Sequence, residues 1–385
     1  MPPKKRPTKN ANSGKMTAKE LMAEVNAVMG ADSVFMGSDK SLQVEYLSTG
    51  LLPFDILLQG GFPKGRMSLI YGDWSTLKSL VGLMTCGQTQ KDGGTAAIID
   101  TEHAYDPKWA KQMGINTDDL IVWPRRDDEE EHSGEEAVDT AQVLTANGVD
   151  LIVFDSVAAA MPQAESAKRL KGESIQPARL AQLMSAATRR LTAVNNKTAF
   201  IFINQTRVNI GITFGSNEAH PGGKALPFYA SYIMNVRKTG KITKDVKVYT
   251  GEKWTTVKEQ HGQVYKAELT KSKLNKPFRE VWFTWDMKTG QIDLPGFLIA
   301  QGLETGLVQQ KGNTWSYGNV KAVGREKFKD ALANNSNAMM QLEMEVRDWH
   351  GLPQIVTIPQ NRKVVRRSTG KPVVVKKTVK RLRRA

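Results

Sequence analysis

The segment Met67–Ser79, MSLIYGDWSTLKS, places the tightest constraint on what this 385-residue chain can fold into. A short apolar run predicts a buried strand over 67–71, a turn opens at Gly72, and Lys78-Ser79 leads into an apolar helical stretch. This is the layout of a phosphate-binding loop, in which helix N-terminal N–H groups, the lysine and the hydroxyl hold a nucleotide's phosphates and Mg²⁺. The pattern GxxxxGK[ST] has glycine where this chain has Leu77. Taken alone, the segment therefore also fits an ordinary strand–helix turn with a surface lysine.

Apolar strands alternate with helical stretches downstream of this segment. Strands are predicted over 95–100, 120–123, 150–155 and 198–204, and helices over 107–113, 134–147 and 178–195. Continuous apolar strands separated by helices predict an α/β fold with a mostly parallel sheet covered by helices on both faces. In such a sheet, the chemistry gathers beyond the carboxyl ends of the strands.

Polar residues stand at three of these predicted strand ends. Glu102 follows the strand that ends at Asp100, and an acid there can orient a water for in-line attack. Asp155 ends a second strand after four apolar residues, which is the pattern in which an acid holds Mg²⁺ through a water molecule. Gln205 ends a third, where an amide can sense a γ-phosphate. Each residue alone also fits a cap or turn, but together with the loop they favour nucleotide hydrolysis.

Other segments give coarser predictions. Thr17 and Glu20 form a capping box that opens an amphipathic helix to about residue 29, which must dock on something, such as a neighbouring subunit. Ser48-Thr49-Gly50 is predicted to open a helix that ends at Gly60-Gly61. Shorter antiparallel strands are expected over 229–285, and a smaller α/β unit over 295–350.

The net charge of +15 is concentrated at the two ends of the chain. Residues 1–15 carry five basic residues and 354–385 carry eleven, neither with an acid, so the remainder is near neutral. Such tails bind polyanions such as nucleic acid through counterion release, or alternatively only solubilise the protein. The acid-rich stretch 127–131 is expected to be a solvated loop. The single cysteine, Cys86, and the lack of a long apolar run predict a soluble protein of a reducing, cytoplasmic compartment.

The sequence therefore divides into five expected segments. These are a disordered basic tail (1–15), an N-terminal oligomerisation helix and linker (16–45), a nucleotide-hydrolysing α/β core (46–290), a small C-terminal α/β domain (291–353) and a disordered basic tail (354–385).

From about residue 17 to 350, the chain resembles the bacterial RecA-type recombinases, of which phages also carry divergent members. The resemblance rests on Leu47–Gly50 with Phe54-Asp55, IIDTEHAYDP (98–107), LIVFDSVAAAMPQAE (151–165), FIFINQTRVNIGITFG (200–215), PGGKALPFYAS (221–231) and TKSKLNKPF (270–278). The last two segments are not shared by phosphate-loop ATPases in general, so they narrow the assignment.

The resemblance implies ATP and Mg²⁺ as cofactors. It implies catalytic roles for Glu102, Lys78, Gln205, Lys271 and Lys273, and a metal site at Ser79 and Asp155. The nucleotide contacts that it implies are Gly72, Asp73, Trp74, Ser75, Thr76, Leu77, Lys78, Ser79 and Leu80, with Tyr105 and Asp106 at the adenine. Lys271 and Lys273 match a pair that reaches a neighbouring subunit's ATP, and their i, i+2 spacing on a strand puts both on one face.

The resemblance also implies sites for single-stranded DNA. A second DNA-binding loop is expected over about 205–223, with contacts at Arg207, Asn209, Ile210 and Gly211 and with Gly222 and Gly223 giving it flexibility. A first loop is expected at about 165–177. Further implied positions are Ser185 and Arg189, which contact the DNA backbone, and Phe228, which lies at the interface between subunits in a helical filament.

The implied function is that of a DNA-dependent ATPase that forms filaments on single-stranded DNA, pairs it with homologous duplex DNA and exchanges strands. The chain departs from the family at Leu77, at Asn209, where a cation would contact phosphate, and in its basic tail, which is expected to anchor DNA. Two alternatives stay open. One is a ring-forming motor such as a helicase, and the other is a structural protein that coats single strands with weak or lost ATPase activity.

Overall fold

The computed structural model describes residues 16–124, 132–163, 177–208, 218–219, 221–249 and 254–354, which fall into two compact units divided between Tyr46 and Leu47. The acid-rich stretch, both basic tails and most of the first predicted DNA loop lie outside these residues. The N-terminal unit contains helix α1 (Ala18–Met29) and the short 3₁₀ helix η1 (Lys40–Leu42). The predicted capping box is confirmed, because the Glu20 amide donates to Thr17 Oγ1 and the Thr17 amide donates to Glu20 Oε2.

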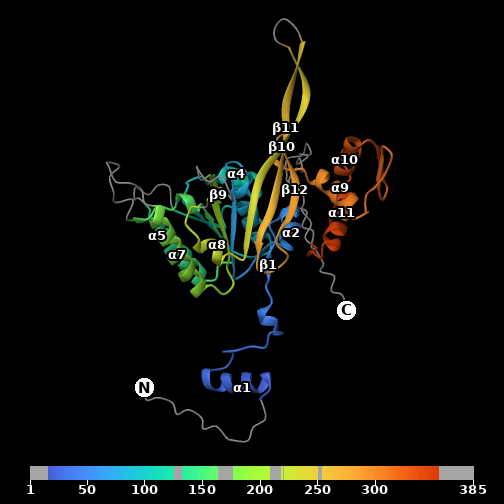
Figure 1. Cartoon of the computed structure of the whole chain (residues 1–385). Helices are drawn as coiled ribbons and strands as arrows, with labels where there is room; N and C mark the ends of the chain where they lie inside the picture. The colour runs from blue at the N-terminus through green and yellow to red at the C-terminus, as the bar shows by residue number, and fades with distance from the viewer. Residues whose placement is uncertain are drawn as a thin grey trace, which may run out of the picture. The chain divides into compact units, whose positions relative to one another are not determined.

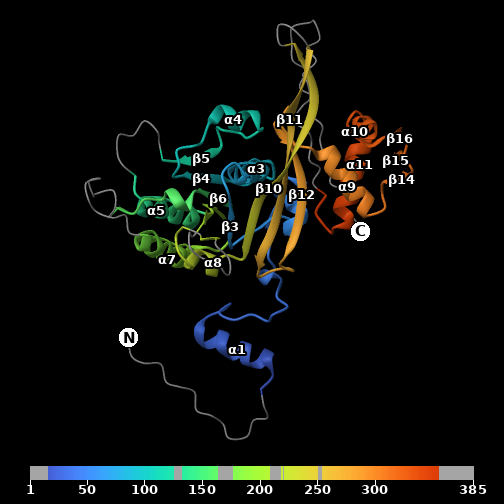
Figure 2. The same cartoon turned by 45° about the horizontal axis from the view of Figure 1, so that its top comes forward.

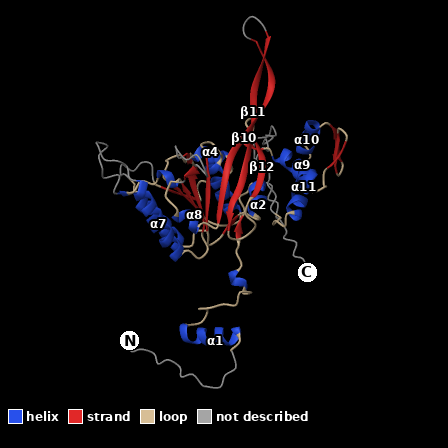
Figure 3. Cartoon of the chain, in the orientation of Figure 1, coloured by secondary structure: helices blue, strands red, loops and turns tan. Residues whose placement is uncertain are grey.

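The larger unit is built on a sheet of nine strands among the described residues, in the order β13-β12-β11-β10-β3-β7-β6-β4-β5 (Figures 1 and 3). Their bounds are β3 Met67–Gly72, β4 Ala96–Asp100, β5 Leu120–Trp123, β6 Leu151–Asp155, β7 Ala199–Gln205, β10 Tyr232–Tyr249, β11 Trp254–Ser272, β12 Arg279–Asp286 and β13 Gln291–Ile292. From β10 to β5 every neighbouring pair is parallel. The predicted mostly parallel α/β sheet is confirmed.

Helices cover both faces of the parallel strands (Figure 2). On one face Ile98 and Ile201 share a core with α2 (Leu52–Leu58) and α3 (Lys78–Lys91). On the other face Ile99 and Phe202 share a core with α5 (Gly134–Ala146) and α7 (Pro177–Val194). The short helices α4 (Pro107–Gln112), η2 (Val157–Ala159) and α8 (Ala225–Tyr229) complete this part. Since successive strand residues face opposite cores, continuous apolar runs are required, which is why the sequence pattern located these strands.

The antiparallel part differs from the prediction in strand length. The antiparallel pairing of β10, β11 and β12 is confirmed, but β10 and β11 have 18 and 19 residues and are not short. β10 pairs with β3 from Tyr232 to Asn235 and no further. β11 pairs with β12 only from Gly262 onward. Within the described residues, the rest of the two strands pairs only with itself, as a hairpin that projects beyond the sheet (Figure 1). Register shifts near Gly240 and Gly262 interrupt the alternation that sequence patterns detect.

The region predicted as a smaller α/β unit contains both helices and strands, and it belongs to the same compact unit as the large sheet. It consists of α9 (Leu294–Glu304), a three-stranded antiparallel sheet of β14 (Gln309–Lys311), β15 (Thr314–Tyr317) and β16 (Val320–Val323), and the helices α10 (Arg325–Ala333) and α11 (Ser336–Trp349). Short strands also occur at β1 (Tyr46–Leu47), β2 (Phe62–Pro63), β8 (Arg207–Val208) and β9 (Glu218–Ala219). No helix in the described ranges is both long and apolar enough to cross a membrane.

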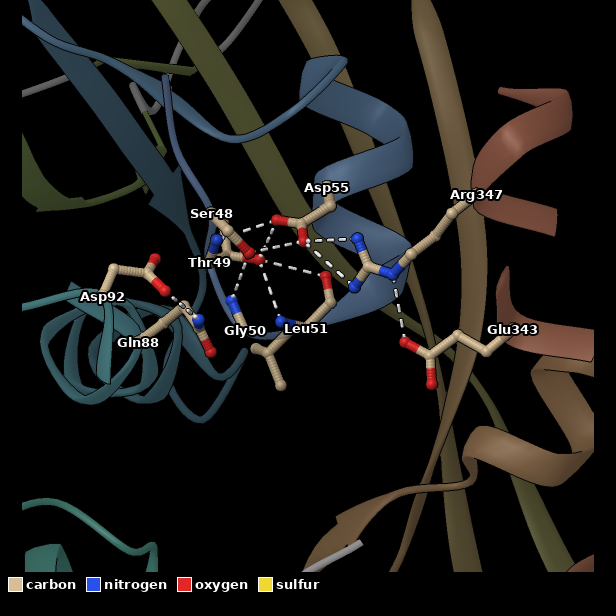
Figure 4. A network of polar contacts seen from close by, with 9 residues as sticks. All are labelled: Ser48, Thr49, Gly50, Leu51, Asp55, Gln88, Asp92, Glu343 and Arg347. Atoms are coloured by element: carbon tan, nitrogen blue, oxygen red, sulfur yellow. Dashed lines mark hydrogen bonds and ion pairs between the residues drawn. The ribbon is translucent and has the colours of Figure 1, made fainter. Parts of the chain in front are cut away.

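The helix predicted from Ser48-Thr49-Gly50 is wrong at its start. Helix α2 begins at Leu52, and its N-cap Leu51 makes no side-chain cap. The hydroxyls of Ser48 and Thr49 instead donate to the Asp55 carboxylate, at 2.7 and 2.8 Å (Figure 4). A Ser-Thr pair before an apolar run is a helix-start signal. Here a buried carboxylate inside the helix binds both hydroxyls.

Asp55 also pairs with a residue from the far end of the chain. Both terminal guanidinium nitrogens of Arg347, on α11, lie 3.4 Å from Asp55 Oδ2, and Arg347 Nε donates to Glu343 Oε1 at 3.1 Å (Figure 4). All three side chains are about 1% exposed. Burial raises the pKa of Asp55, and hydrogen bonds from Ser48 and the charge of Arg347 oppose that rise. This buried ion network fastens the C-terminal helices to the core.

Candidate nucleotide site

The phosphate loop runs from the end of β3 at Gly72 to the start of α3 at Lys78. A Cβ on Gly72 would lie 2.2 Å from the Val236 carbonyl oxygen, so only glycine fits between the loop and β10. At the other end, α3 has no side-chain cap, which leaves its first backbone N–H groups available to an anion. The predicted strand, turn and helix are confirmed.

Lys78 folds back over its own loop. Its Nζ donates to the carbonyl oxygens of Gly72 at 3.0 Å and Asp73 at 2.7 Å, and to Thr76 Oγ1 at 3.3 Å. Burial lowers the pKa of Lys78, while the carboxylates of Asp155 and Glu102 raise it. The ammonium group therefore lies inside the loop, where it can meet the phosphates of a bound nucleotide.

Leu77 holds the position where the motif has glycine, and it adopts the left-handed backbone conformation that glycine favours, with φ of 66°. An L-residue in that conformation costs roughly 1–2 kcal/mol. The Leu77 side chain is partly buried against the core, which offsets some of this strain. The departure from the motif thus keeps the backbone shape of the motif but adds a side chain to it.

We expect Leu77→Gly to bind ATP several-fold more tightly, because the loop backbone can then approach the phosphates without a side chain in the way. The free energy of unfolding should change by about 1 kcal/mol or less, since relief of backbone strain offsets the lost packing. Calorimetric titration with ATP and urea unfolding measure the two quantities. Unchanged ATP affinity would mean that Leu77 does not limit the loop.

Ser79 and Asp155 lie together, as a shared Mg²⁺ site requires. A side-chain interaction with Ser79 lowers the pKa of Asp155, which stands at the end of β6, so the two side chains are neighbours. Burial raises the pKa of Asp155 to about 6, the carboxylates of Glu102 and Asp100 add to the rise, and Ser79 and Lys78 oppose it. A hydroxyl beside a partly buried carboxylate and an open helix N-terminus fits an Mg²⁺ bound through one protein carboxylate and nucleotide phosphates.

Glu102 and Gln205 are in direct contact. Gln205 Nε2 donates to Glu102 Oε1 at 3.0 Å, and the Ser156 hydroxyl donates to the same oxygen. The ends of β4 and β6 are tied together because the Thr101 amide donates to the Asp155 carbonyl oxygen at 2.9 Å. Gln205 is paired in register with Gly72. The predicted polar strand ends therefore meet the phosphate loop at one edge of the sheet.

The residues implied for the adenine have other contacts in the structure. The Asp106 carboxylate caps α4 by accepting from the Lys108 amide at 2.9 Å, and Tyr105 is half-buried against the core. Asp100 accepts from the amides of Ala104 and Tyr105, at 3.0 and 2.8 Å, and so shapes the loop that carries Glu102. Binding of adenine by Tyr105 and Asp106 stays a prediction.

Lys271 and Lys273 lie at the opposite edge of the sheet from this chain's own phosphate loop. Lys273 N donates to the Ser231 carbonyl and Ser231 N to the Met67 carbonyl, so the pair lies beside the start of β3, whereas the loop follows its end. Both ammonium groups bind carbonyl oxygens of α8, and both contact the Phe228 carbonyl, at 3.2 and 2.7 Å. The expectation that they share one face is confirmed. They cannot reach the nucleotide of their own loop.

Phe228 is 71% exposed beside these lysines. It lines, with Lys273, Arg66 and Tyr229, a cavity of about 380 Å³ at this edge of the sheet. A large exposed aromatic side chain beside a cavity is typical of a contact surface. The interface role of Phe228 stays a prediction.

The predicted DNA contacts are only partly described. Ser185 and Arg189 lie one turn apart on α7, with Arg189 exposed, and Arg207 belongs to β8, whereas Asn209, Ile210 and Gly211 lie outside the described residues. Gly222 and Gly223 have φ of 87° and 72°. A Cβ on either would lie 2.8 Å from Val157 or Ala181. Left-handed backbone and close packing on η2 and α7, and not flexibility alone, thus explain these two glycines.

Three residues of the site escaped sequence reasoning. Ser156 bonds Glu102, Tyr265 donates from β11 to the Ser75 carbonyl oxygen at 3.2 Å, and the Lys238 ammonium lies 3.7 Å from the centre of the Trp74 ring. Lys238 and Tyr265 lie far from the loop in sequence, so no local pattern could have found them. Ser156 was visible as the residue after Asp155, but its hydroxyl had no predicted partner.

Comparisons with known proteins agree with this geometry. The family model of the RecA N-terminal domain matches residues 16–290. The chain is 37% identical to Protein RecA of Clostridium perfringens (strain SM101) over 351 residues, which are 89% of this chain and 94% of that protein. It is 37% identical to Protein RecA of Caulobacter vibrioides over 85% of this chain and 87% of the relative. It is 38% identical to Protein RecA of Nitrobacter winogradskyi over 86% of this chain and 88% of that protein.

Proposed function

The chain belongs to the RecA family, and on that premise we propose that it is a DNA-dependent ATPase that forms filaments on single-stranded DNA and exchanges strands in recombination and repair. The observation that carries the proposal is the convergence of Lys78, Asp155, Glu102 and Gln205 at one edge of the sheet. Neither a ring-forming motor nor a structural single-strand-coating protein is favoured by similarity to RecA proteins over most of the chain.

ATP and Mg²⁺ are the proposed cofactors. The loop from Gly72 to Ser79 and Leu80, in the first turn of α3, would hold the phosphates, with Ser79 and Asp155 holding the metal. Mg²⁺, when bound, would neutralise charge on the phosphates that are being cleaved. Lys78 would exchange its loop carbonyl partners for phosphate oxygens, which charge-assisted hydrogen bonds favour.

Glu102 is the proposed base that orients the attacking water, and Gln205 is the proposed sensor of the γ-phosphate. Their 3.0 Å hydrogen bond supports both roles, because it holds the carboxylate and the amide side by side next to the phosphate loop. Asn204, next to Gln205, donates to the Pro221 carbonyl oxygen at 2.8 Å, near the end of the second predicted DNA loop. Loss of the γ-phosphate contact at Gln205 would thereby change the conformation of that loop, and the loop would then hold DNA less tightly.

Lys271 and Lys273 are proposed to act on the neighbouring subunit's ATP, which their position at the far edge of the sheet supports. A site completed by the next subunit makes a head-to-tail contact, and repeated contacts of that kind generate a helical filament. Phe228 and helix α1, whose Leu21, Val25 and Met29 are exposed, are proposed to take part in the same interface. The proposed location of the protein is the cytoplasm.

ATP hydrolysis with and without single-stranded DNA tests the function, followed by strand pairing with a homologous duplex. We expect turnover that rises with single-stranded DNA and is lost in Lys78→Ala, which also controls for contaminating ATPases. Electron microscopy should show open filaments when DNA and ATP are present. Wild-type protein without DNA-stimulated turnover would contradict the proposal. Closed rings in place of open filaments would favour a ring-forming motor over a recombinase.

A further inference from the structure

The base of the β10–β11 hairpin touches the phosphate loop at three successive places. The Val236 carbonyl packs against Gly72, and the Tyr265 hydroxyl donates to the Ser75 carbonyl oxygen at 3.2 Å. Between them, the Lys238 ammonium lies 3.7 Å from the centre of the Trp74 ring. The hairpin therefore presents to the loop a lysine that lies 164 residues after Trp74 in the sequence.

Trp74 is unusual as a loop residue because its side chain is 79% exposed. An indole ring attracts an ammonium group to its face, and this contact holds the long lysine side chain in one place. Lys238 is half-buried, and it makes no ion pair or side-chain hydrogen bond within the described part of the chain. Its N–H donors are therefore not used by a protein acceptor there.

Lys238 adds a second positive charge beside the loop that contains Lys78. Two ammonium groups at one loop create a place where a multiply charged anion is favoured. Lys78 has three oxygen partners in the loop, whereas Lys238 has no oxygen partner among the described residues and has donors to offer.

We propose that Lys238 is a second phosphate-binding lysine of the nucleotide site in the same subunit, held in place by the ring of Trp74. This rests on the proposed function, which makes the loop an ATP site. Lys238 would act on the phosphates from the hairpin side, in addition to the lysines expected from a neighbouring subunit. It would also link the hairpin to nucleotide occupancy, since the hairpin and the phosphates would share one side chain.

Nucleotide binding without DNA tests this assignment, by calorimetric titration with ATPγS, ADP and AMP in the presence of Mg²⁺. For Lys238→Met we expect about tenfold weaker binding of ATPγS and ADP, the loss typical of one charge-assisted hydrogen bond. Binding of AMP should stay at its wild-type value, because AMP lacks the β- and γ-phosphates. Lys238→Arg should restore most of the affinity, and Trp74→Leu should lose part of it.

Lys241→Met is the matched control, because Lys241 is an exposed lysine farther along the same strand, and its nucleotide affinities should not change. Melting temperatures without nucleotide separate binding from folding, and Lys238→Gln provides a second neutral variant. Equal weakening of AMP and ATPγS would mean that Lys238 only supports the loop, which overturns the assignment. Unchanged affinity for ATPγS would overturn it as well.

The outcome is separable from the proposed function. Wild-type protein that binds ATPγS but shows no DNA-stimulated hydrolysis would remove the recombinase proposal and leave the role of Lys238 standing. Normal DNA-stimulated hydrolysis in the wild type, with no loss of nucleotide affinity in Lys238→Met, would remove only the role of Lys238. Wild-type protein that binds no nucleotide would overturn both.

Discussion

Replacing Arg347 by methionine is expected to lower the free energy of unfolding by about 3–5 kcal/mol, the loss found when one partner of a buried ion pair is removed. The guanidinium group is the positive partner of both Asp55 and Glu343, and all three side chains are about 1% exposed. Methionine fills much of the space but leaves two buried carboxylates without their cation. Urea unfolding followed by circular dichroism measures the loss.

The loss should depend on pH in a way that a simple packing defect would not. Burial already raises the pKa of Asp55 in the intact protein, and removing Arg347 takes away one of the interactions that oppose the rise. When the pKa of a carboxyl is higher in the folded state than in the unfolded chain, stability is lost as pH rises from the unfolded-state pKa through the folded-state pKa. The difference between Arg347→Met and wild type should therefore be larger at pH 8 than at pH 5.

An exposed ion pair on the same protein provides the control. Arg190 contacts Asp139 at 2.5 Å, with side chains 47% and 58% exposed, and Arg190→Met should change the free energy of unfolding by about 1 kcal/mol or less. If Arg347→Met were no more destabilising than Arg190→Met, the buried network would not fasten the C-terminal helices to the core.

The sequence predicted those parts of the fold that depend on neighbours along the chain. Strands such as 150–155 and 198–204 are buried on both faces, so each reads as a continuous apolar run that ends in a polar residue. Because the carboxyl ends of parallel strands share one edge, the pattern of apolar runs is enough to place Asp155 and Gln205 near the loop.

Contacts between distant segments could not be predicted in this way. Asp55 and Arg347 are 292 residues apart, and nothing beside Ser48-Thr49 shows that their hydroxyls are needed by a buried carboxylate and not by a helix end. In the same way, Lys238 lies on a strand whose charged residues fit an ordinary solvated hairpin. Only the pairing of β10 with β3 brings that strand beside the phosphate loop.

Replacing Asp155 by asparagine is expected to abolish most ATP hydrolysis while making the nucleotide-free protein more stable. Turnover should fall by roughly 100-fold or more, because the proposed Mg²⁺ site loses its carboxylate. Asparagine has nearly the same shape as aspartate, and its side-chain oxygen can still accept a hydrogen bond. Initial rates with saturating single-stranded DNA measure the loss.

The gain in stability follows from the raised pKa of Asp155, about 6, which results mainly from burial. An acid whose pKa is higher in the folded state than in the unfolded chain destabilises the fold once it ionises, so wild-type stability falls as pH rises from about 4 to 6. A neutral asparagine avoids this penalty. Asp155→Asn should be about 1–3 kcal/mol more stable than wild type at pH 8, and nearly equal to it at pH 4.

A cation site requires an ionised carboxylate, and without the metal this charge lowers the stability of the folded protein. Asp155 would therefore be retained for Mg²⁺ binding at a cost in stability. Asp139→Asn, at an exposed carboxylate, serves as the control and should leave both turnover and the pH dependence of stability unchanged. Loss of turnover in Asp155→Asn without the gain at pH 8 would show that the ionised carboxylate is already well compensated by Lys78 and Ser79. A gain at pH 8 with turnover retained would instead place the metal on other residues.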